Sequence, residues 1–274
     1  MPLHFDSITN DARNASVIAW ILQKGTHEPE AVFATEDRNY ILMRKRLTDA
    51  DSRESIGWLI ITMKNNEVRK QLEILDLDIV LDSDTTCAIR FLEKRPDSSD
   101  ANEYYEVETA DNRQHLEVET VNRHMIPDPL TDTVREVHVS IFPFRLSIYD
   151  AIDDLNRELG FDKPVEAANT GLFIRGFSER FCMPGGMVSG DKEEDEHYSY
   201  IIGKVVSFRN AVFKFGENRL PFVLAKVDTA LGEVPVAVGP EVFDLKELKN
   251  GCVIAMYADV KADLAPPGVY RSLQ

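Results

Sequence analysis

The chain has 274 residues, of which 43% are hydrophobic and 28% charged, and its formal net charge is −16. This composition is typical of a globular protein rather than a disordered one, and the length favours two domains. The cysteines Cys87, Cys182 and Cys252 are odd in number and far apart, so neither a disulfide framework nor a zinc knuckle is indicated. With no signal-like start and no apolar run of membrane length, we expect a cytoplasmic protein that binds no membrane.

Short strands dominate the first part of the chain. Residues 10–24 fit either a helix or a buried strand. Residues 31–34 and 40–44 flank a polar turn and predict a hairpin, and the apolar run 56–63 has the length of a strand.

The clearest alternation in the chain covers residues 72–82, where leucine and isoleucine alternate with aspartate and valine. A period of two predicts an antiparallel strand with one buried face. Asp76 and Asp78 share the other face and are weak candidates for a Ca²⁺ or Mg²⁺ site. The favoured interpretation is a solvent-facing acidic strand edge, so no metal or other cofactor is expected.

Further strands are expected at 87–94, at 103–109 and 115–121 as a hairpin, and at 136–141. One helix is predicted over 148–159. Ser147 would cap its N-terminus, Gly160 would follow its C-terminus, and an apolar stripe lies between them.

Residues 172–182 read as a strand, and the acidic segment 183–197 reads as a linker or loop. After it, the chain predicts a long strand or strand pair at 200–215, strands at 220–227 and 233–238, a short helix at 240–248, and a strand at 252–260.

This last order of elements resembles the OB-fold, a small five-stranded Greek-key barrel. The resemblance rests on residues 246–251 leading into the strand 253–257, and it covers about 65 residues by pattern only. It implies a face that binds oligonucleotides or oligosaccharides. A fifth strand is missing after Val260, so the long first strand would have to bend near Arg209–Asn210, or 172–182 would have to lend a strand. The fold class is thus α+β, predominantly antiparallel β, with a β-rich domain over 1–182 and an OB-like β-barrel over 198–274.

Charge reverses in the C-terminal part. Between Tyr198 and Val227, five cations stand against one acid, a net of +4, and four phenylalanines are interleaved with them. Cations and aromatic rings on extended chain suit phosphate contact and base stacking. The alternative is that the phenylalanines are barrel core and the cations surface residues. The candidate nucleic-acid-binding residues are Lys204, Phe208, Arg209, Phe213, Lys214, Arg219, Phe222 and Lys226.

Three classes of function follow from these patterns. We found no catalytic motif, which favours a non-enzymatic binding or assembly protein acting through a protein partner or a homo-oligomer. The basic and aromatic window favours an accessory protein that binds single-stranded nucleic acid. The glycines and acids of 183–196 motivate a third hypothesis, an enzyme of unrecognised type with a site near that loop.

Overall fold

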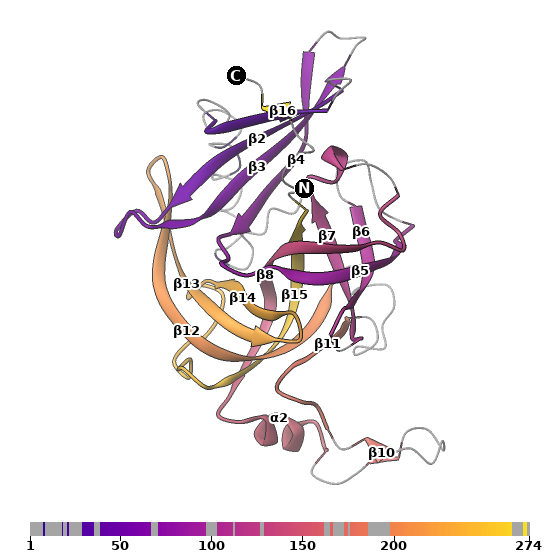
Figure 1. Cartoon of the computed structure of the whole chain (residues 1–274). Helices are drawn as coiled ribbons and strands as arrows, with labels where there is room; N and C mark the ends of the chain where they lie inside the picture. The colour runs from indigo at the N-terminus through magenta and orange to yellow at the C-terminus, as the bar shows by residue number, and fades with distance from the viewer. Residues whose placement is uncertain are drawn as a thin grey trace.

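The computed structural model describes residues 8, 18, 21, 29–35, 39–66, 71–96, 103–111, 113–126, 129–161, 165–166, 173–174, 176–185, 198–264 and 271–272. Within them the protein is mainly β, with two principal sheets and a single α-helix, as Figure 1 shows. The expected predominance of antiparallel strands is confirmed. The segment 10–24 lies outside the described residues except for Ile18 and Ile21. None of the described helices is long and apolar enough to cross a membrane.

The first sheet is an antiparallel meander at the top of Figure 1. Its strands are β1 (Ala31–Ala34), β2 (Tyr40–Thr48), β3 (Ser55–Asn66) and β4 (Gln71–Leu81), and the short β16 (Arg271–Ser272) pairs with β1. The predicted hairpin is confirmed, because β1 and β2 pair antiparallel. The apolar run 56–63 lies inside β3.

Strand β4 differs from the expected half-buried edge. Its alternation is present, but its C-terminal half is buried on both faces. Leu77 and Ile79 face one hydrophobic cluster, while Val80 faces another. Asp76 and Asp78 are only 7% and 2% exposed, so the interpretation as a solvent-facing acidic edge is wrong. The other sheet covers this face, which no local pattern reveals.

The second sheet has nine strands. In spatial order they are β11 (Phe181–Pro184), β12 (Ser199–Phe215), β13 (Asn218–Thr229), β14 (Gly232–Val238), β8 (Val134–Tyr149), β15 (Val253–Asp263), β7 (His115–Val121), β6 (Glu103–Thr109) and β5 (Cys87–Lys94). Additional pairings of β12 with β15 and of β5 with β8 close it into two five-strand rings that share β8 and β15. Strands from both sides of the predicted 183–197 linker belong to this one sheet.

The two rings repeat one pairing scheme. In each, an antiparallel three-strand meander (β5–β6–β7 or β12–β13–β14) precedes a long strand (β8 or β15) that pairs back with the first strand of the meander. The third strand of each meander then lies parallel to the long strand of the other unit. β8 and β15 are therefore the centre of the molecule, and residues on β15 reach both sheets.

The α-helix among the described residues is shorter than predicted. α2 covers Ile152–Glu158, below the rings in Figure 1, and its N-cap is Ala151 rather than Ser147. The Asp154 side chain accepts a hydrogen bond from the backbone N–H of Ala151 at 3.2 Å. Ser147 and Ile148 instead continue β8, because they pair with β15. Strand pairing outweighs the local capping signal here.

Two other expected elements are replaced. Within 172–182, the described strands are only β10 (Phe173–Ile174), which pairs with β9 (Val165–Glu166), and the start of β11. Residues 240–248 form isolated turns instead of a helix. Phe243, Leu245 and Leu248 pack against the ring core from these turns. A 3-10 helix, η3 (Arg123–Met125), follows β7.

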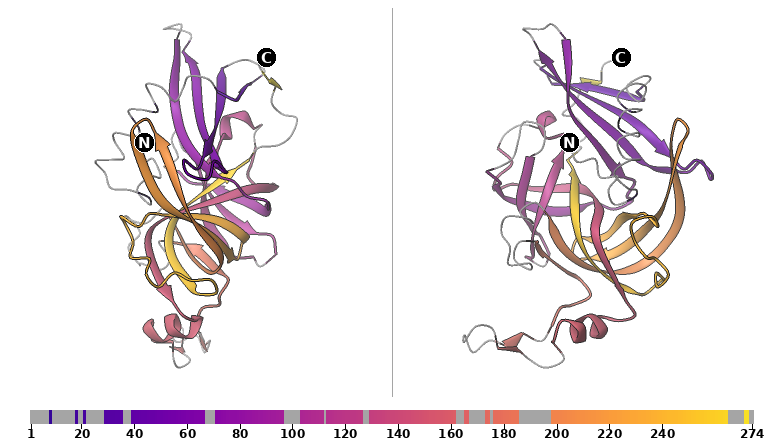
Figure 2. Two further views of the ribbon diagram at one scale, coloured as in Figure 1. Left: turned by 90° about the vertical axis from the view of Figure 1, so that its left-hand side faces the viewer. Right: turned by 180° about the vertical axis from the view of Figure 1, so that it is seen from behind.

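The two sheets meet along the β12–β13 hairpin, which curves up beside the first sheet (Figures 1 and 2). Phe213, Phe215, Leu220 and Phe222 of this hairpin share one hydrophobic cluster with side chains of β3 and β4. The turn between β2 and β3 also docks on β12, where Ala50 N–H donates to the carbonyl of Val212 at 3.0 Å.

Candidate functional site

The predicted nucleic-acid-binding residues all lie on β12 and β13, paired in register from Lys204 to Phe215. A β-bulge interrupts this register at Val206, between Val205 and Ser207, a few residues before the expected bend at Arg209–Asn210. Residues 206–208 are exposed as a result. Bulges redirect side chains and are frequent beside functional sites.

The aromatic residues of this window divide into core and surface. Phe213 and Phe222 are each 1% exposed and stack on one another, with ring centroids 4.4 Å apart. They fill the core between the sheets, so they do not offer a face to a base, and this part of the prediction is corrected. Phe208 is 40% exposed and is left as the accessible aromatic side chain of the predicted set.

Four of the five cations are engaged in ion pairs with carboxylates that lie elsewhere in the chain. The pairs are Lys204–Glu179 (3.4 Å), Arg209–Asp49 (3.1 Å), Arg219–Asp51 (2.6 Å) and Lys226–Glu233 (3.6 Å). Asp49 is buried, whereas the other three pairs are exposed and contribute little to stability. All four place negative charge beside a cation. The net charge of +4 in the sequence window is therefore offset in the folded protein. Lys214 is exposed, opposite Arg219 across the hairpin.

A cleft of about 520 Å³ opens between the first sheet and the β12–β14 surface. Phe208, Arg209 and Lys226 line one side, and residues 82–85, which follow β4, line another. Its charged lining residues comprise four carboxylates and two cations, a net of −2. The carboxylates are Glu54, Asp82, Asp84 and Glu233. This cleft thus suits a cationic ligand better than a phosphate.

Phe208 also borders a second hollow of about 430 Å³ on its other side. The lining there is largely apolar and includes Pro221, Val223, Leu245 and Leu248. Phe208 therefore lines both an acidic cleft and an apolar hollow. We call these three features together the Phe208 surface.

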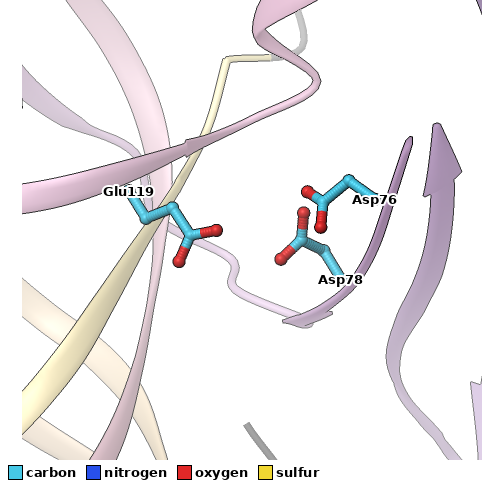
Figure 3. Close-up of side chains that lie close together, drawn as sticks. All are labelled: Asp76, Asp78 and Glu119. Atoms are coloured by element: carbon cyan, nitrogen blue, oxygen red, sulfur yellow. The ribbon is translucent and has the colours of Figure 1, made fainter. Parts of the chain in front are cut away.

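A second constellation is buried where the first sheet meets β7 and β15. Lys261 is completely buried, and its ammonium contacts Asp78 Oδ1 at 2.6 Å and the carboxylate of Glu119. Asp76 lies beside them on the same face of β4 as Asp78. Figure 3 shows how Asp76 and Asp78 point from β4 toward Glu119 of β7. These four residues form what we call the Lys261 cluster.

Burial and mutual repulsion alter the ionisation of the Lys261 cluster. Burial, followed by the nearby Asp78 carboxylate, raises the pKa of Asp76 to about 10, so Asp76 is neutral at pH 7. Burial alone would lower the pKa of Lys261, but the carboxylates of Asp78, Glu119 and Asp76 raise it above its usual value. Burial and the neighbouring carboxylate thus favour the neutral form of Asp76, while the carboxylates around Lys261 favour its charged form.

The three acidic side chains have oxygen atoms within 4.8 Å of one another, close enough to share a cation. The ammonium of Lys261 already supplies positive charge to two of them. A metal ion at Asp76 and Asp78 would have to displace this lysine, and it stays an untested prediction.

A second ionic contact from β15 joins the same two sheets. Asp263, two residues after Lys261, accepts two hydrogen bonds from Arg44 of β2 at 2.8 and 3.0 Å. Asn122 donates a third, at 2.8 Å. Alternate residues of one strand thus hold β4 and β2 of the first sheet.

The third sequence hypothesis placed an enzyme near 183–196, most of which lies outside the described residues. Cys182, next to this segment, is 2% exposed, and burial raises its pKa to about 12. Burial has the same effect on Cys87. Neither thiol has the thiolate character that a nucleophile needs at neutral pH.

Sequence reasoning missed Glu119 and Lys261 as members of a site. A signal was present in both strands: Glu119 lies between Val118 and Thr120 in the strand 115–121, and Lys261 lies near the end of a strand that begins with the apolar run 253–258. A charged residue inside a strand that reads as buried needs a partner. The partners come from distant strands, with Lys261 and Asp78 separated by 183 residues, and the sequence does not indicate such a pairing.

No family model matches this chain, and neither a curated protein nor a solved structure is similar enough to it to be reported as a relative.

Proposed function

We propose that the protein is a non-enzymatic binding protein that engages a protein partner through the Phe208 surface. The observation that supports this most is an exposed aromatic side chain just after a bulge, which lines both an acidic cleft and an apolar hollow. Aromatic side chains beside pockets are frequent anchors of protein interfaces.

The charge of the cleft favours a particular partner. Four carboxylates against two cations attract a segment that carries lysine or arginine, and the apolar hollow accommodates an aliphatic side chain next to it. The same charges oppose a polyanion. This argues for a basic and apolar peptide segment over single-stranded nucleic acid, the alternative that the sequence window raised.

The framework of this surface is, we infer, an OB-like barrel completed from an earlier part of the chain. The ring β12–β13–β14–β8–β15 contains the meander and the later strand that the sequence pattern predicted. β8 pairs between β14 and β15, where a fifth strand is needed. Phe208 itself lies on the first strand of this ring.

A peptide selection tests the proposal. Random peptides displayed on phage would be selected on the full chain and on two variants, Phe208→Ser and Val134→Ser. Val134 is the matched control, because it is an exposed apolar residue (52%) that lines neither hollow. We expect enriched peptides with lysine or arginine beside an aliphatic residue, which bind wild type and Val134→Ser but not Phe208→Ser. Enriched peptides that bind Phe208→Ser as well as wild type, or no enriched peptides on the wild-type chain, would refute the proposal.

A further inference from the structure

The Lys261 cluster brings together the groups that amide formation requires. Lys261 and Asp78 are 183 residues apart in the chain, yet Nζ lies 2.6 Å from Asp78 Oδ1. With a C–O bond of about 1.2 Å, Nζ is then at most about 3.8 Å from Asp78 Cγ. Reacting atoms held near this separation gain a large rate advantage over the same groups in free solution.

A proton acceptor and an acid flank this pair. Glu119 contacts the same ammonium from β7, at the register position directly beside Lys261. Asp76, neutral at pH 7, hydrogen-bonds Asp78 and draws charge from its carboxyl group. Proximity, a base and an acid are the components of acyl transfer to an amine.

Burial also supplies the driving force for reaction. Lys261 is 0% and Asp78 2% exposed, so both charges are held out of water. Condensation turns these two buried ions into a neutral amide and water, which removes the cost of keeping both charges out of water. Exclusion of bulk water opposes hydrolysis of an amide once it has formed.

We propose that Lys261 and Asp78 condense after folding into an intramolecular isopeptide bond that ties β15 to β4. Lys261 passes one proton to Glu119, and the free amine forms a bond from Nζ to Asp78 Cγ. The bond from Cγ to one Asp78 oxygen breaks. That oxygen leaves as water with one proton from the nitrogen and one returned by Glu119. Glu119 ends as a carboxylate, Asp76 ends unchanged, and no oxidant or cofactor is consumed.

The intact mass of the purified full-length chain tests this directly. We expect a mass lower by one water, about 18 Da, than that of the sequence, counted with or without Met1. Proteolysis and fragmentation should yield one branched peptide that joins Lys261 to Asp78. A wild-type chain that keeps its full mass after a day at 37 °C, or a branch at Glu119 instead of Asp78, overturns the proposal.

Variants separate the reaction from simple loss of fold. Lys261→Met and Glu119→Gln should both have the full sequence mass. Asp263→Asn, two residues along β15 in the neighbouring ion pair, is the matched control and should keep the loss of water. Under denaturing electrophoresis the wild type should run faster than Lys261→Met, because the cross-link closes a large loop. Since the wild-type mass decides the question, the test holds even where a variant does not fold.

Discussion

Truncation of Phe213 to alanine is expected to lower the free energy of unfolding by about 3–5 kcal/mol, because it removes a buried ring and leaves a cavity. The ring is 1% exposed, stacks on Phe222 at 4.4 Å, and belongs to the cluster that joins the hairpin to the first sheet. Phe208→Ala is the matched comparison, since it removes the same atoms from an exposed residue on the same strand, closer to the bulge.

The expected loss of unfolding free energy is smaller for Phe208→Ala than for Phe213→Ala. Phe208 is 40% exposed, so its truncation forfeits roughly 60% of the 1.5–3 kcal/mol for full burial, about 1–2 kcal/mol, and opens no enclosed cavity. Urea denaturation followed by tryptophan fluorescence measures the free energy of unfolding of both variants. The difference between the variants should be about 2–3 kcal/mol. Equal losses would refute the division of these phenylalanines into core and surface.

Other consequences concern packing, protonation and thiol access. Gly57→Ala should destabilise the β3–β4 pairing, seen as a lower urea midpoint, because a Cβ at Gly57 would meet the Val80 carbonyl oxygen at 2.1 Å; an unchanged midpoint would contradict this close approach. Asp76 has a folded pKa of about 10 against 3.8 unfolded, so wild-type stability should fall as pH rises from about 4 to 10. In Asp76→Asn the free energy of unfolding, measured by denaturation across this pH range, should fall less steeply with pH than in the wild type. An equally steep fall in both proteins would contradict a neutral Asp76. Cys182 should react with a thiol reagent far more slowly in the native chain than in urea, because it is 2% exposed and burial raises its pKa to about 12; fast native labelling would count against its burial.

Local patterns predicted the strands well. The alternation in 72–82, the hairpin at 31–44 and the meander after residue 200 all follow from period-two patterns and polar turns, which depend on neighbours in sequence. The helix at 148–159 was overextended for a related reason. Ser147 and Ile148 carry a good capping signal, but their partner strand β15 begins about 100 residues later.

The candidate sites were harder to predict, because their character depends on distant partners. Phe208 and Phe213 look alike in sequence, and only docking of the hairpin on the first sheet separates them. The cations at 209 and 219 are paired with Asp49 and Asp51 from another sheet. Asp78 reads as a surface residue until Lys261 is brought to it across the fold.

We propose above all that the Phe208 surface binds a cationic, apolar segment and not a polyanion. Fluorescence anisotropy at low salt, where electrostatic attraction is strongest, tests it with two labelled probes: a peptide of alternating lysine and leucine, and a single-stranded oligonucleotide. We predict that the full chain binds the peptide, that Phe208→Ser weakens this binding, and that the oligonucleotide stays free. Binding of the oligonucleotide, or no binding of the peptide, would contradict the account.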